Sequence, residues 1–173
     1  MLEFLDKWCA ENNKILEICG RGKDKDGPER DFYADQLNNC EWQFKPITDN
    51  FSSYKLIDDA EIVVCIDSTL GYESIGRGKK TAIFSCRGRS IHSVATNFGW
   101  PADLPNNGLF WTNNQSEMEF QRVMDYLSSV NSEDWRQTCQ LYASELMEFD
   151  PGNTRFINLL DQLLTKSGSK YTN

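Results

Sequence analysis

A pair of hydroxyl residues stands where a hydrophobic strand is expected to pass into a helix. Ser68 and Thr69 follow the expected strand 61–66, and the N–H groups and positive dipole of a helix start can hold a phosphate. Gly71 would let a ligand approach the backbone closely. Glu73 lies one turn further on, where its carboxylate can accept hydrogen bonds from sugar hydroxyls. The segment predicts a phosphate and sugar site, and simple helix capping by Ser68 or Thr69 is the competing interpretation.

Basic residues gather in two other loops that follow expected strands. One loop comes after Cys19 and the other after Cys86, and together they carry five of the 18 basic residues: Arg21, Lys23, Lys25, Arg87 and Arg89. In an open parallel sheet the ligand site lies outside the carboxyl ends of the strands, so all three loops should share one rim. They predict an anion site there, with Asp67 as an additional candidate residue. Taken singly, each basic loop could equally be a solvated turn, the first one neutralised by neighbouring aspartates.

Other chemistries fit the sequence poorly. His92 is the single histidine, so a base of the usual imidazole kind would have to be this residue, and we keep it as an additional candidate. The six cysteines include no Cys-x-x-Cys pair, which predicts free thiols and no metal site. The segment 20–22, Gly-Arg-Gly, lacks the third glycine of a dinucleotide fingerprint, and the chain has no Walker loop. We therefore expect no metal and no cofactor.

Composition limits the choice of partners. The 173 residues carry a formal charge of −8, with 39% hydrophobic and 12% aromatic residues, which predicts one soluble domain with a substantial core. A chain this acidic is not expected to bind nucleic acid or an anionic membrane as its main partner, although a local basic site stays open. No window has the apolar length of a membrane span, and the first residues do not form a secretion signal. These features predict a cytoplasmic protein.

Alternating strand and helix patterns predict the elements that position these residues. The pattern favours an α/β fold, a Rossmann-like three-layer domain with a mostly parallel sheet and C-terminal helices. We divide the single domain, 1–173, into a leading helix (1–12), an α/β core (13–112), C-terminal helices (115–166) and a tail expected to fray (167–173). A long irregular stretch covers 87–107, and Ser116 with Glu119 forms a capping-box pattern. The expected strands are Lys14–Cys19, Glu41–Lys45, Glu61–Ile66, Thr81–Cys86 and Leu109–Thr112.

The stretch 58–81 resembles a known enzyme core. Its Asp67-Ser68-Thr69, the following Glu73 and the pair Gly78-Lys79 look like the donor-binding segment of GT-B glycosyltransferases in bacterial O-antigen and capsule biosynthesis. The likeness covers residues 15–89 and includes the segment 20–23, which is similar to the basic loop after the first strand of that domain. The resemblance implies that Ser68, Thr69, Gly71, Arg21 and Lys23 meet the donor phosphate and that Glu73 meets the nucleoside. Some related enzymes use CMP-linked acidic sugars.

The length of the chain departs from this family. A GT-B enzyme has two Rossmann-like domains, and 173 residues hold only one, so the resemblance implies a donor-binding half that is inactive without an acceptor domain. Its partners would be a nucleotide-sugar and, through the missing N-terminal domain, a glycan or lipid-linked acceptor, at the inner face of the cytoplasmic membrane. One of the helices after Asn131 would cross back towards that domain. Two alternatives stay open: a sugar-nucleotide epimerase-like enzyme that uses His92, and a non-enzymatic module that binds a nucleotide or a partner.

Overall fold

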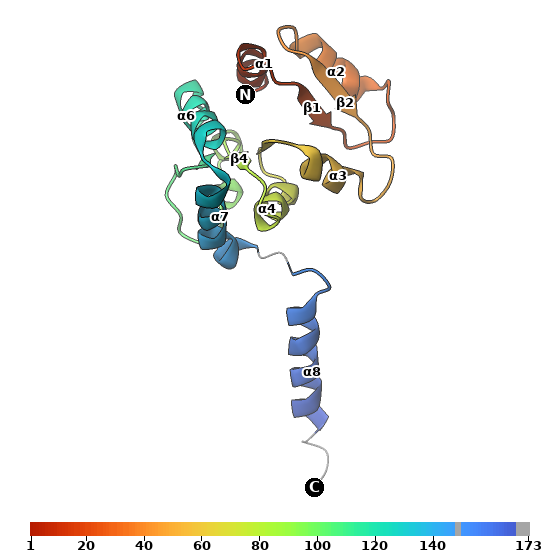
Figure 1. Cartoon of the computed structure of the whole chain (residues 1–173), viewed down its shortest axis with the longest axis vertical. Helices are drawn as coiled ribbons and strands as arrows, with labels where there is room; N and C mark the ends of the chain where they lie inside the picture. The colour runs from red at the N-terminus through yellow and green to blue at the C-terminus, as the bar shows by residue number, and fades with distance from the viewer. Residues whose placement is uncertain (148–149, 169–173) are drawn as a thin grey trace.

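The computed structural model describes residues 1–147 and 150–168, apart from the side chains of residues 89, 143–145 and 166–168 (Figure 1). Short strands alternate with helices along the first two thirds of the chain, and helices follow. The elements are α1 (Leu2–Glu11), β1 (Leu16–Cys19), α2 (Pro28–Gln36), β2 (Trp42–Lys45), α3 (Ser52–Asp59), β3 (Val63–Cys65), α4 (Thr69–Gly76), β4 (Thr81–Phe84), α5 (Gly88–Ile91), the 3-10 helix η1 (Val94–Thr96), β5 (Trp111–Thr112), α6 (Glu117–Ser129), α7 (Ser132–Leu146) and α8 (Thr154–Gly168).

Every pair of neighbouring strands is parallel, as predicted. β1 pairs with β2, and β4 lies between β3 and β5, so the strands form a two-stranded and a three-stranded piece rather than one unbroken sheet. An ion pair between Lys14 and Glu61 joins the starts of β1 and β3. The chain steps from β1 to β2 in one piece and from β3 through β4 to β5 in the other. Within each piece, neighbouring strands therefore follow one another along the chain.

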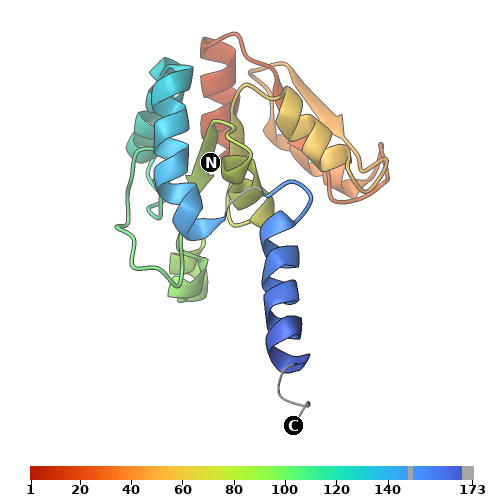
Figure 2. The ribbon, with the colours of Figure 1, turned by 60° about the horizontal axis from the view of Figure 1, so that its bottom comes forward.

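Helices cover both faces of the three-stranded piece (Figures 1 and 2). Ile83 and Phe84 are successive residues of β4, and successive side chains of a strand point to opposite faces. The Phe84 ring lies 4.5 Å from that of Phe120 in α6, whereas Ile83 lies beneath α4. α1 lies beside α6, where Phe4 and Phe120 have their ring centroids 5.6 Å apart. The result is the Rossmann-like three-layer fold that the sequence predicts.

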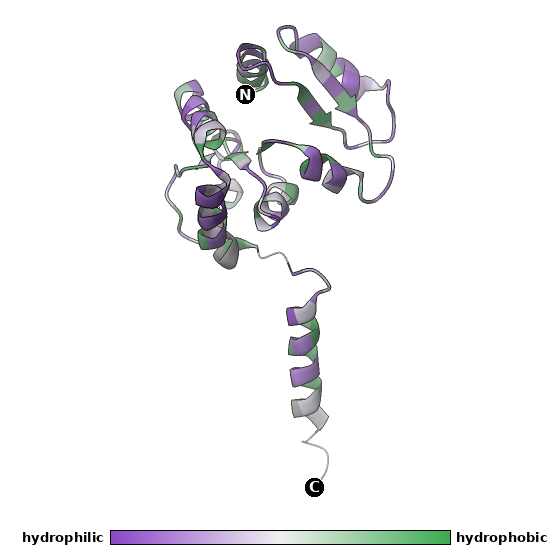
Figure 3. Cartoon of the chain, in the orientation of Figure 1, coloured by the Kyte–Doolittle hydropathy of each residue, from purple (hydrophilic) through white to green (hydrophobic). Residues whose placement is uncertain are grey.

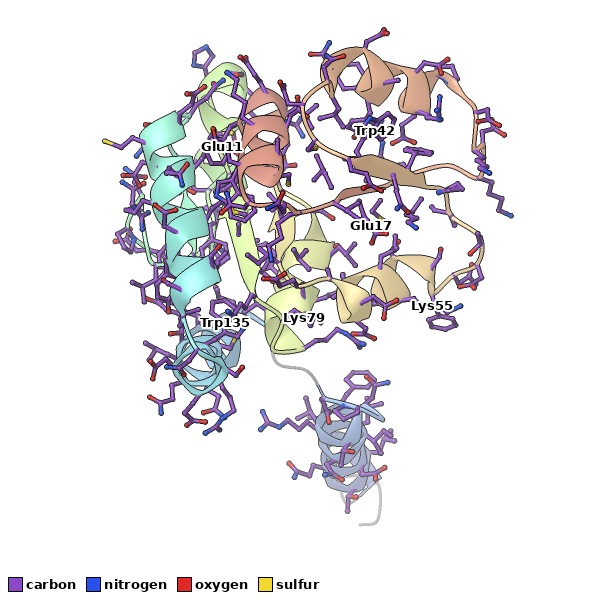
Figure 4. The ribbon with its side chains drawn as sticks, turned by 45° about the horizontal axis from the view of Figure 1, so that its top comes forward. Glu11, Glu17, Trp42, Lys55, Lys79 and Trp135 are labelled. Atoms are coloured by element: carbon purple, nitrogen blue, oxygen red, sulfur yellow. The ribbon has the colours of Figure 1, made fainter. Side chains whose placement is uncertain are left out.

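The turn between α4 and β4 is tied to the C-terminal helices. The Lys80 ammonium donates to the carbonyl oxygens of Leu127 (2.9 Å) and Val130 (2.7 Å), which lie at the end of α6. Trp135 of α7, labelled in Figure 4, donates its indole N–H to the carbonyl of Gly78 at 2.9 Å. The two Lys80 bonds satisfy carbonyls that the end of α6 leaves without partners. Together with the Trp135 bond, they fix α6 and α7 against the sheet.

A buried carboxylate connects α1 to the segment before β2. Asp6 is only 1% exposed, and its oxygens accept the backbone N–H groups of Asn38, Asn39 and Cys40 at 2.9 to 3.1 Å as well as the side-chain amide of Asn39. Burial alone would raise the pKa of Asp6, but these hydrogen bonds outweigh it and hold the pKa well below its usual range. The leading helix is therefore fixed to the α/β core.

Two local expectations need correction. Ser116 stands at the N-cap of α6, but its side chain makes no capping bond and Glu119 pairs instead with Arg122 at 2.9 Å, so the capping box does not form. The stretch 87–107 is not wholly irregular, because it contains α5 and η1. It is also anchored: the Gly99 N–H donates to the Tyr72 hydroxyl at 2.9 Å. Residues 169–173 of the expected tail lie outside the described part of the chain.

Candidate functional site

The start of α4 lies at the carboxyl end of β3. Ser68 is the N-cap, with extended backbone angles, and its hydroxyl accepts the N–H of Leu70 at 3.2 Å. The backbone N–H of Ser68 donates to the sulfur of Cys65 at 3.3 Å. Burial raises the pKa of the Cys65 thiol and keeps the thiol neutral. Thr69 is the first residue of the helix, and both hydroxyl residues are exposed. Ser68 thus does cap the helix, and the capped turn still faces solvent at the rim.

Gly71 is placed differently from the other candidates. It is buried, and a β-carbon at this position would stand 2.8 Å from the Cys65 sulfur and 2.8 Å from the Ile83 methyl carbon. The missing side chain therefore lets α4 pack closely onto β3 and β4. We correct the expectation that it opens the backbone to a ligand, since the space beside it is filled by the sheet.

Arg87 lies beside the Ser68 turn. Its guanidinium forms an ion pair of 2.9 Å with Asp67, and the hydroxyl of Ser85 donates to the carbonyl of Ile66 at 3.0 Å, so the loops after β3 and β4 are joined twice. The Arg87 side chain is 58% exposed, against 25% for Asp67. A cation is thus held next to the helix start while it stays open to solvent. The structure brings these two candidates together as the sequence predicts.

The loop after β1 is a separate part of the rim. The Arg21 guanidinium is 92% exposed and donates through Nε to Glu29 at 3.3 Å, while Lys23 is exposed. The Ile47 N–H donates to the Gly22 carbonyl at 2.8 Å, which ties this loop to the one after β2. Among the described side chains, no hydrogen bond or ion pair joins this loop to the Ser68 turn. Glu29 pairs with Arg21 and partly neutralises the basic loop, whereas the solvated-loop interpretation names the neighbouring aspartates.

Glu73 points to α3. It accepts a short hydrogen bond from the hydroxyl of Tyr54, which raises the pKa of that tyrosine. Arg77 lies over the Tyr54 ring, 5.6 Å from its centroid, and forms a bidentate ion pair with Asp58. Sequence reasoning missed this cluster. The i, i+4 spacing of Tyr54 with Asp58 in α3, and of Glu73 with Arg77 at the end of α4, is the signal that could have revealed it.

The remaining candidates lie in and after α5. His92 is exposed and takes a left-handed conformation (φ 48°) at the end of that helix. The side chain of Arg89 lies outside the described part. Within the described residues, no group of three His, Cys, Asp or Glu side chains could hold a metal ion, and no helix is long and apolar enough to cross a membrane.

The fold is a Rossmann-like α/β domain, and its Ser68–Thr69 turn lies at the carboxyl end of β3. A protein-family model described as "putative O-antigen biosynthesis protein" matches residues 1–164. The chain belongs to this family, which indicates a part in O-antigen biosynthesis. No curated protein and no solved structure matches it.

Proposed function

We propose that this chain is the nucleotide-sugar-binding domain of a GT-B-like glycosyltransferase in O-antigen and lipopolysaccharide biosynthesis. One observation supports the proposal most strongly: the Ser68–Thr69 turn opens α4 at the carboxyl end of β3, next to a cation that Asp67 holds in place. Helix starts and guanidinium groups both favour phosphate oxygens. Membership of an O-antigen biosynthesis family supports the same function, because O-antigens are built from activated sugars.

The residues at this turn would act on the leaving group. When the bond between the sugar and the phosphate oxygen breaks, its electron pair passes to the nucleotide, and negative charge develops on the phosphate. The Thr69 hydroxyl, the backbone at the start of α4 and the Arg87 guanidinium can stabilise that charge, with Arg21 and Lys23 on the other loop. All of these donors belong to the protein itself. The acceptor hydroxyl forms the new bond and gives its proton to a base on the acceptor domain.

Glu73 would orient the nucleoside. A carboxylate accepts hydrogen bonds through both oxygens, so Glu73 can hold a ribose hydroxyl while the Tyr54 hydroxyl remains bonded to Oε2. The bond to Tyr54 fixes the rotamer of Glu73 between α3 and α4. Donor and acceptor, the latter a glycan or a lipid-linked glycan, would then meet on the cytoplasmic side of the membrane.

Calorimetric titration with CMP, CDP, UDP and GDP tests the proposal. We expect at least one nucleotide to bind with a Kd below about 1 mM, the weak end of specific affinities. Arg87→Met should weaken that binding about tenfold, because it removes a charge-assisted bond to phosphate. Arg136→Met is the matched control, since Arg136 pairs with Glu133 on the surface of α7, and it should bind as the wild type does. A folded chain that binds none of the four nucleotides at millimolar concentration contradicts the proposal.

A further inference from the structure

The last described helix, α8, exposes a continuous apolar face. It extends away from the α/β body, and Figure 3 shows hydrophobic residues along one side of it and hydrophilic residues along the other. Each of the large hydrophobic residues of α8 is at least 40% exposed: Phe156, Ile157, Leu159, Leu160, Leu163 and Leu164. A face of this size is unusual on a soluble domain and indicates a binding surface.

The apolar and polar residues of α8 separate completely into two arcs over 154–166. At 100° per residue, the six apolar residues occupy an arc of about 160°. Thr154, Asn158, Asp161, Gln162 and Thr165 fall in the opposite arc. Arg155 and Lys166 occupy helix positions at the border of the apolar arc, next to that of Leu159. A half-cylinder of this kind fits a flat apolar medium, whereas a two-stranded coiled coil needs a narrower seam.

Charge distinguishes α8 from the rest of the chain. Residues 151–173 carry three basic side chains and one acidic one, for a net charge of +2, whereas residues 1–150 have 25 acidic and 15 basic side chains. The negative charge of the body is screened over about 8 Å at physiological salt. A helix of 15 residues is about 22 Å long, so most of α8 lies beyond that range. The helix can therefore meet a negative surface that the body would repel.

The hollow between α1 and α6 does not match the apolar face of α8 in size. The hollow has a volume of about 320 Å³, with Phe4, Trp8 and Met118 as its apolar lining and Glu11, labelled in Figure 4, at its edge. Seven residues line it, too few to receive a helix with six large apolar side chains. The hollow on a second copy of this chain would therefore not bury the apolar face of α8.

We propose that α8 binds the surface of an anionic phospholipid bilayer, lying in the interface with its apolar arc among the acyl chains. Arg155, at the border of the arc, would reach the phosphate groups. The helix is too short to cross a hydrocarbon core of about 30 Å, so it would lie along the surface. This inference does not depend on the donor site, because α8 shares none of its residues.

Vesicle co-sedimentation of the full chain tests the proposal. The vesicles are pure phosphatidylcholine or phosphatidylcholine with about one third phosphatidylglycerol, a strongly anionic surface. Leu160→Glu puts a carboxylate into the apolar arc, and Gln162→Glu puts the same carboxylate on the polar side of the same helix. Both change the net charge equally, so the difference between them measures burial of the apolar face. Because these side chains are exposed, both variants should keep the thermal midpoint of the wild type, and Leu163→Glu repeats the test at a second apolar position.

We expect the wild type and Gln162→Glu to sediment with the anionic vesicles and much less with pure phosphatidylcholine. Leu160→Glu should lower the partition coefficient by about tenfold or more relative to Gln162→Glu, the effect of failing to bury one leucine. The proposal is overturned if the wild type stays in the supernatant with both vesicles, whether or not light scattering shows a dimer. It is also overturned if Leu160→Glu and Gln162→Glu bind the anionic vesicles equally, or if the wild type binds anionic and pure phosphatidylcholine vesicles equally.

Discussion

Gly71 of α4 lies so close to Cys65 of β3 that a β-carbon on the glycine would stand 2.8 Å from the cysteine sulfur. Real β-carbons are not found at such separations, so this contact sets how near the helix can come to the sheet. The same approach places Ser68 and Thr69 directly beyond the end of β3. The geometry of the candidate phosphate turn thus depends on a residue that no ligand would touch.

Gly71→Ala should destabilise the fold. Alanine favours a helix interior by up to about 1 kcal/mol over glycine, but overpacking against Cys65 and Ile83 costs about 1–3 kcal/mol and should exceed that gain. Urea unfolding measures the difference. Gly22→Ala is the control, because its β-carbon would meet open space, and it should change the free energy of unfolding by less than about 0.5 kcal/mol. A Gly71→Ala protein as stable as the wild type would show that the helix can move away from the sheet.

Asp6→Ala should cost about 2–3 kcal/mol of unfolding free energy, because it removes a charged acceptor from several backbone donors. The matched variant is Glu11→Ala, an exposed acid at the end of the same helix, which should stay within about 0.5 kcal/mol of the wild type. If chemical denaturation shows that Asp6→Ala and Glu11→Ala lower the free energy of unfolding equally, Asp6 does not anchor α1.

The stabilisation by Asp6 should depend on pH. Because the pKa of Asp6 is lower in the folded protein than in the unfolded one, where it is about 3.9, its contribution is complete at pH values about one unit or more above 3.9 and declines as the pH falls further. The gap in unfolding free energy between the wild type and Asp6→Asn should therefore narrow between about pH 5 and pH 2. Denaturation at a series of pH values checks this, and a gap that stays constant or widens on acidification would refute it.

Lys80→Met should loosen the end of α6. The substitution keeps the aliphatic stem but removes the ammonium that donates to the carbonyls of Leu127 and Val130, at a cost of about 1–2 kcal/mol. Hydrogen exchange should show faster opening in the last turn of α6. Lys25→Met, in the exposed loop after β1, removes the same charge and should leave that exchange unchanged. Similar exchange rates in both variants would count against the capping role.

The sequence predicted the fold well where its signal is local. The apolar run at 62–66 and the hydroxyl pair after it placed the end of β3 and the start of α4 to within one residue, because strands and helix caps depend on neighbouring residues. It could not show that Gly71 faces the sheet, since this depends on how α4 rotates against β3. The role of Asp6 was also missed, because its partners lie more than 30 residues away.

The candidate site was predicted only in part. Proximity of Asp67 and Arg87 follows from parallel neighbouring strands, whose carboxyl ends share one edge. The pairing of Arg21 with Glu29 and of Glu73 with Tyr54 does not follow from the strand order. Loop conformations and helix rotations decide which opposite charge or hydroxyl comes within reach of these side chains. The rim is consequently less positive than the count of its basic residues indicates.

The central claim is that a nucleotide phosphate binds at the start of α4. Amide chemical-shift mapping of the labelled chain during titration with the best-binding nucleoside diphosphate tests it most directly. We predict that the largest shifts fall on residues 67–71 and Arg87, with smaller ones at 21–23 and near Glu73. A folded chain whose shifts stay unchanged at millimolar nucleotide, or change only on surfaces remote from the start of α4, would contradict the account.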